Sequence, residues 1–149
     1  MLKSIYRFLS PKFQNIFLDY KVDMRPRYGH GLPAHKGLYE IINAHRSDYE
    51  LILKEALKYK EQFWIIKDSS IEKDSIKPAW NNGFLPGLDI IAIYAILAKF
   101  KPSKYIEIGS GNSTKVAYKA KKELGLTTKI ISIDPLPPEE NDSLTDKVD

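Results

Sequence analysis

The chain has 149 residues, of which 43% are apolar and 28% charged, a composition typical of a single soluble domain. It contains no cysteine, which excludes disulfides and thiolate zinc sites. The net charge is +4, but the lysines are scattered along the chain, so there is no clear signal for nucleic-acid binding. The longest apolar stretch, residues 88–98, is too short for a transmembrane segment, and no signal peptide is evident, so we expect a cytoplasmic protein.

The first 79 residues are predicted to form a helical N-terminal region. Residues 1–36 look like an extension, in which apolar stripes at 2–9 and 13–20 predict two short helices. A membrane-surface helix is an alternative for the first stripe, but its weak amphipathicity favours packing on protein. From about Gly37 to about Lys60, apolar residues recur every three or four positions, which predicts one long amphipathic helix.

Residues 80–149 carry the pattern of an α/β domain. Two aromatic side chains among Asn, Gly and Pro residues at 80–87 predict an ordered loop, and a helix follows as far as about Lys101. A strand at 105–108, a helix at 113–124 and a strand at 129–133 then make one βαβ unit. The acidic residues after 138 are expected to begin a further helix.

A glycine-rich turn joins the first of these strands to the helix. Gly109 and Gly111 allow a sharp reversal and let a ligand approach the backbone. Amides at the start of the helix can donate to an anionic ligand group, and Asn112 or Ser113 can cap the helix. Asp134 ends the second strand, where a ribose-binding carboxylate is expected. The pattern therefore predicts half of a nucleoside-cofactor site.

Two residues narrow the choice of cofactor. A dinucleotide motif favours a third glycine, and that position is Thr114. Glu107 is a carboxylate within the strand and needs a compensating partner. The α-amino group of S-adenosyl-L-methionine would provide one, whereas NAD has no comparable group. Thr114 and Glu107 thus favour S-adenosyl-L-methionine over NAD.

The run Glu-Ile-Gly-Ser-Gly at residues 107–111 resembles the first motif of class I S-adenosylmethionine-dependent methyltransferases. Residues 80–89 and 23–31 are similar to an uncharacterised bacterial branch of that family, so the resemblance covers most of the chain from about residue 23. It implies a set of cofactor-binding residues, namely Glu107, Gly109, Ser110, Gly111, Asn112, Ser113, Asp134, Pro135 and Leu136.

The resemblance also implies a role for each position. Glu107 would hold the methionine amino group directly or through water, and the glycine loop would wrap the methionine part and the ribose. Asn112 and Ser113 would donate to the methionine carboxylate. Asp134 would accept hydrogen bonds from both ribose hydroxyls, and the two residues after it would lie beside the adenine.

The implied fold is a Rossmann-like class I methyltransferase fold, which we expect to be truncated after the second strand. The region that usually shapes the acceptor site would then be missing, so no catalytic residue is assigned and the isolated segment is expected to lack turnover. The methyl acceptor is unknown, and we expect a small molecule. Open sheet edges would favour self-association. No metal is expected, because the spacing of His30, His35 and His45 matches no ligand pair.

Alternative functions and roles stay open at this stage. The chain could be an NAD(P)-binding Rossmann oxidoreductase, or a truncated, non-catalytic binding or assembly module. The glycine turn could occur without a ligand, and Glu107 could be a structural carboxylate bonded to nearby amides. The lysines that follow the motif are most simply a solvated helix face: Lys115, Lys119, Lys121 and Lys122.

Overall fold

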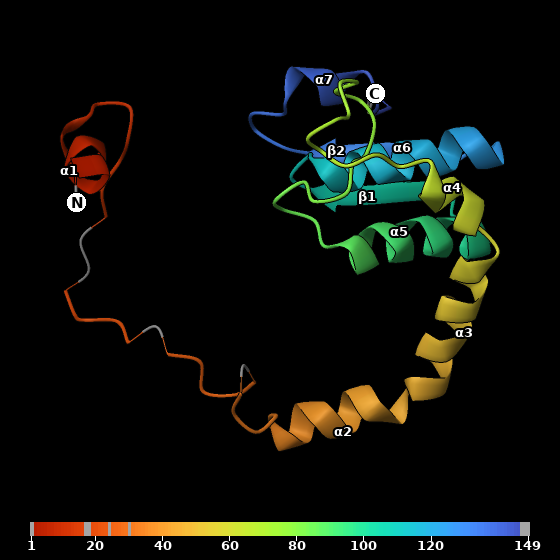
Figure 1. Ribbon diagram of the computed structural model, residues 1–149, viewed down its shortest axis with the longest axis horizontal. Coiled ribbons are helices and arrows are strands. Elements are labelled where there is room, and N and C mark those ends of the chain that lie inside the picture. The colour runs from red at the N-terminus through yellow and green to blue at the C-terminus, as the bar shows by residue number, and fades with distance from the viewer. Residues whose placement is uncertain (1, 17–18, 24, 30, 147–149) are drawn as a thin grey trace. The chain divides into compact units, whose positions relative to one another are not determined.

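The computed structural model describes residues 2–16, 19–23, 25–29 and 31–146. Within them it is a mixed α/β structure with seven helices and a two-stranded parallel sheet (Figure 1). Contacts divide the chain into two compact units, Met1–Ile42 and Asn43–Asp149. The division between the units falls earlier in the chain than the boundary expected between residues 79 and 80. The expected division into a helical region and an α/β domain stays a prediction. None of the helices in the described ranges is long and apolar enough to cross a membrane.

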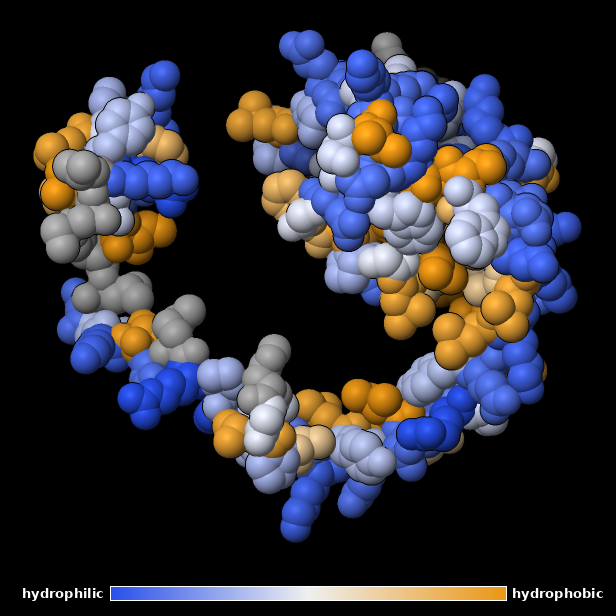
Figure 2. Space-filling view, viewed as in Figure 1, coloured by the Kyte–Doolittle hydropathy of each residue, from blue (hydrophilic) through white to orange (hydrophobic). Residues whose placement is uncertain are grey.

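The first unit contains helix α1 (Leu2–Leu9) and the start of helix α2 (Lys36–Ala44). The second predicted short helix is not formed in the described part of 13–20, and positions 17 and 18 lie outside the described residues. Apolar side chains on α2, including Leu38 and Ile41, stay more than half exposed. Figure 2 shows such apolar side chains on α2 and also on the surface of the second unit.

The prediction of one helix from 37 to 60 is wrong. After α2 the chain forms α3 (Arg46–Leu57) and α4 (Lys60–Trp64), with interruptions at His45 and at Tyr59. Both interrupting residues have φ near −105° and ψ of 20°, outside the α-helical region. The second interruption has a packing reason, because it brings the rings of Tyr59 and Phe63 to 5.4 and 5.3 Å from the ring of Tyr94.

The predicted βαβ unit is confirmed within one or two residues at each boundary. It consists of β1 (Lys104–Ile108), α6 (Asn112–Leu124) and β2 (Lys129–Ile133). Helix α5 (Gly87–Phe100) precedes it and the short α7 (Glu139–Asp142) follows. Gly125 ends α6 in the left-handed conformation, with φ of 62°, as expected for a glycine at this position.

The parallel strands pair with Tyr105 opposite Ile130 and Ile108 opposite Ile133. Side chains alternate between the two faces of a strand, and residues of α5 and α6 pack on the face that carries Ile130. The core beneath them contains Ile90, Tyr94, Leu97, Val116, Ala117, Ala120 and Ile130. On the opposite face Ile106, Ile108 and Ile133 stay exposed, Ile108 by 90%. Within the described residues, the sheet is therefore buried on one side.

The last described residues are attached to the outer edge of β2. The amide of Asp146 donates to the carbonyl of Ile130 at 2.7 Å, and the Asp146 carboxylate accepts from the Ile130 amide at the same distance. Lys121 of α6 also contacts this carboxylate, at 2.8 Å. The Lys121 ammonium, followed by the Ile130 amide, lowers the pKa of Asp146. These contacts attach the end of the segment that contains α7 to β2 and to the last turn of α6.

Replacing Ile130 by Ala should destabilise the fold by about 2–5 kcal/mol, because Ile130 is completely buried and the smaller side chain leaves a cavity. The matched control is Ile106→Ala, which removes the same atoms from the open face and should cost less than about 1 kcal/mol. Urea denaturation followed by circular dichroism would measure both. An equal loss of stability in the two variants would contradict a core on one face of the sheet.

Candidate functional site

The loop between β1 and α6 is built on two glycines. Gly109 has a φ of 83°, a region that favours glycine, and its amide donates to the carbonyl of Ile133 at 2.9 Å. Gly111 is the N-cap of α6. The expectation that Asn112 or Ser113 caps this helix is therefore wrong, since both lie within its first turn.

Glu107 receives hydrogen bonds from hydroxyl groups. The Ser113 hydroxyl donates to Oε2 at 2.8 Å and the Tyr105 hydroxyl at 3.2 Å, while the Thr114 hydroxyl donates to Oε1. Burial, then the charge of Glu107, raises the pKa of Tyr105 to about 12, so Tyr105 stays protonated as a donor. The partners of Glu107 are thus hydroxyls and not the backbone amides considered as an alternative.

Thr114 connects this carboxylate to the glycine loop. Its side chain is completely buried, and its oxygen accepts from the Gly111 amide at 2.9 Å while its hydrogen goes to Glu107. With a glycine at position 114, the Gly111 amide would lose its acceptor and the Glu107 carboxylate would lose a donor. The residue that departs from the dinucleotide motif therefore has a structural function here.

No lysine or arginine in the described ranges forms an ion pair with Glu107, although the residue is only partly exposed. Hydroxyl groups reduce the cost of burying a carboxylate, but they supply no positive charge. The position is therefore electrostatically suited to a cationic group placed beside the loop.

Asp134 connects the end of β2 to the same loop. Its Oδ2 accepts from the Ser110 amide at 2.7 Å, and its Oδ1 accepts from the Leu136 amide at 2.9 Å. These two amides, that of Ser110 first, lower the pKa of Asp134. Each carboxylate oxygen has a further lone pair, so Asp134 can still accept from a ligand.

A cavity of about 540 Å³ lies over the glycine loop. Of the residues predicted to bind the cofactor, those that line it are Gly109, Ser110, Gly111, Asn112 and Ser113. Glu107 and Asp134 do not line it but contact Ser113 and Ser110, which do. Pro135 and Leu136 also lie outside its lining, and Leu136 is 87% exposed.

Two asparagines support this cavity, one in the loop at 80–87 and one in α7. The Asn82 Oδ1 accepts from the side chain of Asn112 at 3.1 Å and from two loop amides, which attaches the loop before α5 to α6. Asn141 of α7 is 1% exposed and donates to the Ser110 hydroxyl at 2.8 Å, while its own Oδ1 has no hydrogen-bond partner among the residues that the structure describes. Asn141 lies in an acidic stretch, so no pattern in the sequence singled it out.

No protein-family model matches the chain, and neither a curated protein nor a solved structure matches it. Among the described residues, no three His, Asp or Glu side chains are grouped as metal ligands, and His30 lies outside those residues. The geometry itself provides a cavity lined by the glycine loop and by the side chains of Ser110 and Ser113. The carboxylates of Asp134 and Glu107 are fixed beside it by their contacts with these two serines. Such a site suits a polar ligand with both donor and acceptor groups.

Replacing Thr114 by Val should destabilise the chain by about 1–3 kcal/mol, because the Gly111 amide loses its acceptor and Glu107 loses a donor around a buried side chain. Thr127→Val is the control, since Thr127 is exposed and the chemical change is the same. Chemical denaturation measures the difference. A Thr114→Val variant as stable as the control would contradict the proposed connection.

The contact between Asp134 and the loop should depend on pH. A lowered pKa means that this contact stabilises the fold above the ordinary aspartate pKa of about 4 and is lost as the pH falls through the folded value. The Ser110 amide resonance, followed by NMR from pH 7 downward, should therefore titrate with a midpoint below about 4. A midpoint at or above the ordinary value, or the same titration in Asp134→Asn, would contradict this.

Proposed function

We propose that this chain binds S-adenosyl-L-methionine over the loop between β1 and α6, and that it acts in methyl transfer within a class I, Rossmann-like methyltransferase fold. The observation that carries the proposal is Glu107, a carboxylate held by three hydroxyl groups without a cationic partner among the described residues. The βαβ order and the motif beside it support the same proposal. The methyl acceptor is a proposed small molecule that the geometry does not identify.

The charges at the site favour a cationic cofactor. Glu107 lies near the end of β1 and Asp134 directly follows β2, so both carboxylates lie at the carboxyl ends of parallel strands, where α/β sheets bind ligands. S-adenosyl-L-methionine carries an ammonium and a sulfonium group. A nicotinamide dinucleotide instead carries a pyrophosphate at the glycine loop, where the charge of Glu107 would repel it.

Different residues of the site would bind different parts of the cofactor. Glu107 would attract the ammonium group, while amides of the loop and of the first turn of α6 would donate to the methionine carboxylate. Asp134 would accept from ribose hydroxyls with its remaining lone pairs. The cofactor supplies the electrophilic methyl group, and the protein contributes by positioning the groups and excluding water.

Isothermal titration calorimetry tests the proposal. S-adenosylhomocysteine, which retains the amino group, should bind one site, and NADH should not bind. Glu107→Gln should weaken binding about tenfold or more, because a charge-assisted contact is lost while the size is kept. Glu61→Gln is the matched control, since Glu61 is an exposed residue of α4. Binding of NADH without S-adenosylhomocysteine would overturn the proposal.

A further inference from the structure

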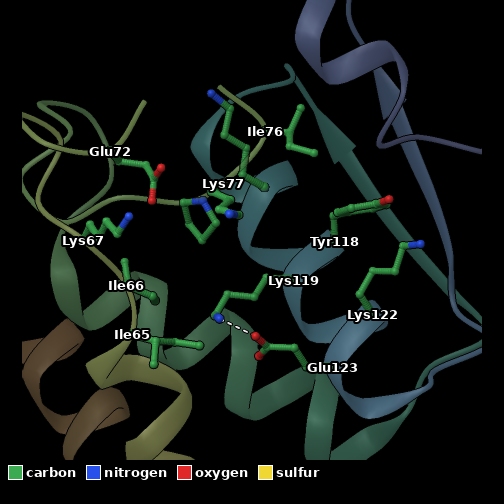
Figure 3. Close-up of a pocket in the computed structure, with 12 residues that line it drawn as sticks. Ile65, Ile66, Lys67, Glu72, Ile76, Lys77, Tyr118, Lys119, Lys122 and Glu123 are labelled. Carbon is green, nitrogen blue, oxygen red and sulfur yellow. Dashed lines mark hydrogen bonds and ion pairs between the residues drawn. The ribbon is translucent and has the colours of Figure 1, made fainter. Parts of the chain in front are cut away.

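A second cavity, of about 410 Å³, is lined by residues outside the glycine loop (Figure 3). One wall is the segment from residue 65 to 78 and the other is the exposed side of α6. Its volume falls in the range of about 300–1,000 Å³ that is usual for small-molecule sites. Neither the motif nor the proposed function accounts for this cavity.

The cavity combines an apolar surface with an excess of positive charge. Its apolar surface comes from Ile65, Ile66, Ile76, Pro78 and Tyr118. Five lysines surround it, against the two carboxylates of Glu72 and Glu123: Lys67, Lys77, Lys115, Lys119 and Lys122. Figure 3 shows the side chains of Ile65 and Ile66 on one side, and those of Lys119 and Lys122 on the helix opposite.

The lysines on α6 are not a simple solvated face. The side chains of Lys115 and Lys119 are only 15% and 12% exposed, and each forms an ion pair, with Glu140 and Glu123 respectively. Glu123 also accepts from the buried hydroxyl of Tyr94 at 3.0 Å, which fixes its position. The Glu123 carboxylate is therefore already paired with Lys119 and Tyr94, and it does not neutralise the other lysines at the cavity.

Two lysines at this cavity have no carboxylate partner among the described residues. Lys67 is exposed and forms no ion pair there, and the Lys122 ammonium lies 5.5 Å above the Tyr118 ring. Ammonium groups next to an apolar surface complement a ligand that has an apolar body and one negative end.

We infer that this second cavity binds a small amphipathic anion, whose aliphatic chain contacts the isoleucines and whose negative head group is attracted by the excess of lysine charge around the cavity, above all by Lys67 and Lys122. The lysines supply point charges without the fork geometry of arginine, so carboxylate and phosphate head groups both suit the cavity. Lys115 lines both cavities, so the proposed ligand would lie close to the loop site without entering it. The inference does not depend on methyl transfer.

The test is an NMR titration of the full chain with octanoate, hexanoate and octanol. Octanoate should shift the amides of Ile66, Lys67 and Tyr118 saturably, and hexanoate should bind about tenfold more weakly because two methylene groups are lost. Octanol, which has the chain without the charge, should also bind about tenfold more weakly. Octyl phosphate, which carries the same chain on another anion, should shift the same amides, and octanol binding as tightly as octanoate would overturn the inference.

Two double variants with the same change in charge complete the test. Lys67→Gln with Lys122→Gln should weaken octanoate binding about tenfold or more, whereas Lys104→Gln with Lys129→Gln should leave it unchanged, because the latter pair lies on the sheet. Dispersed amide spectra would confirm that both variants fold. Equal weakening in both, or shifts confined to the exposed face of Ile106 and Ile108, would overturn the inference.

Discussion

The hydroxyl of Thr114 is the contact on which the geometry of the loop depends. It accepts from the Gly111 amide and donates to Glu107, so a single buried group connects a strand, a glycine turn and a helix start. The turn between β1 and α6 has little side-chain packing of its own, because two of its residues are glycines. A hydrogen-bonded connection therefore replaces the hydrophobic contacts that usually hold a loop.

The same loop is held from three other directions. Asp134 binds the Ser110 amide from β2, Asn141 binds the Ser110 hydroxyl from α7, and Asn82 reaches the side chain of Asn112 from the loop before α5. These partners come from parts of the chain that are far apart in sequence. The loop is therefore ordered by folding, before any ligand binds. Binding then requires little further loss of conformational entropy in the loop, as in a preorganised site.

Local patterns were sufficient to predict the βαβ unit but not the details of its site. Strands of alternating or continuous apolar residues and a helix ended by Gly125 have strong local signals, and they formed as expected. The interruption at Tyr59 could not be read from periodicity, because it depends on the packing of aromatic rings against Tyr94. The position of Asp134 was predicted from spacing, whereas the contribution of Asn141 depends on a tertiary contact that no local pattern encodes.

The hydroxyl partners of Glu107 have a consequence for how the loop could respond to a ligand. A hydroxyl hydrogen turns about its C–O bond, so Ser113, Thr114 or Tyr105 can each redirect its donor while the oxygen stays in place. A carboxylate held by backbone amides would instead need a change in the main chain to release a lone pair. Glu107 can therefore exchange one donor for another by rotation alone, with β1 and α6 remaining where they are.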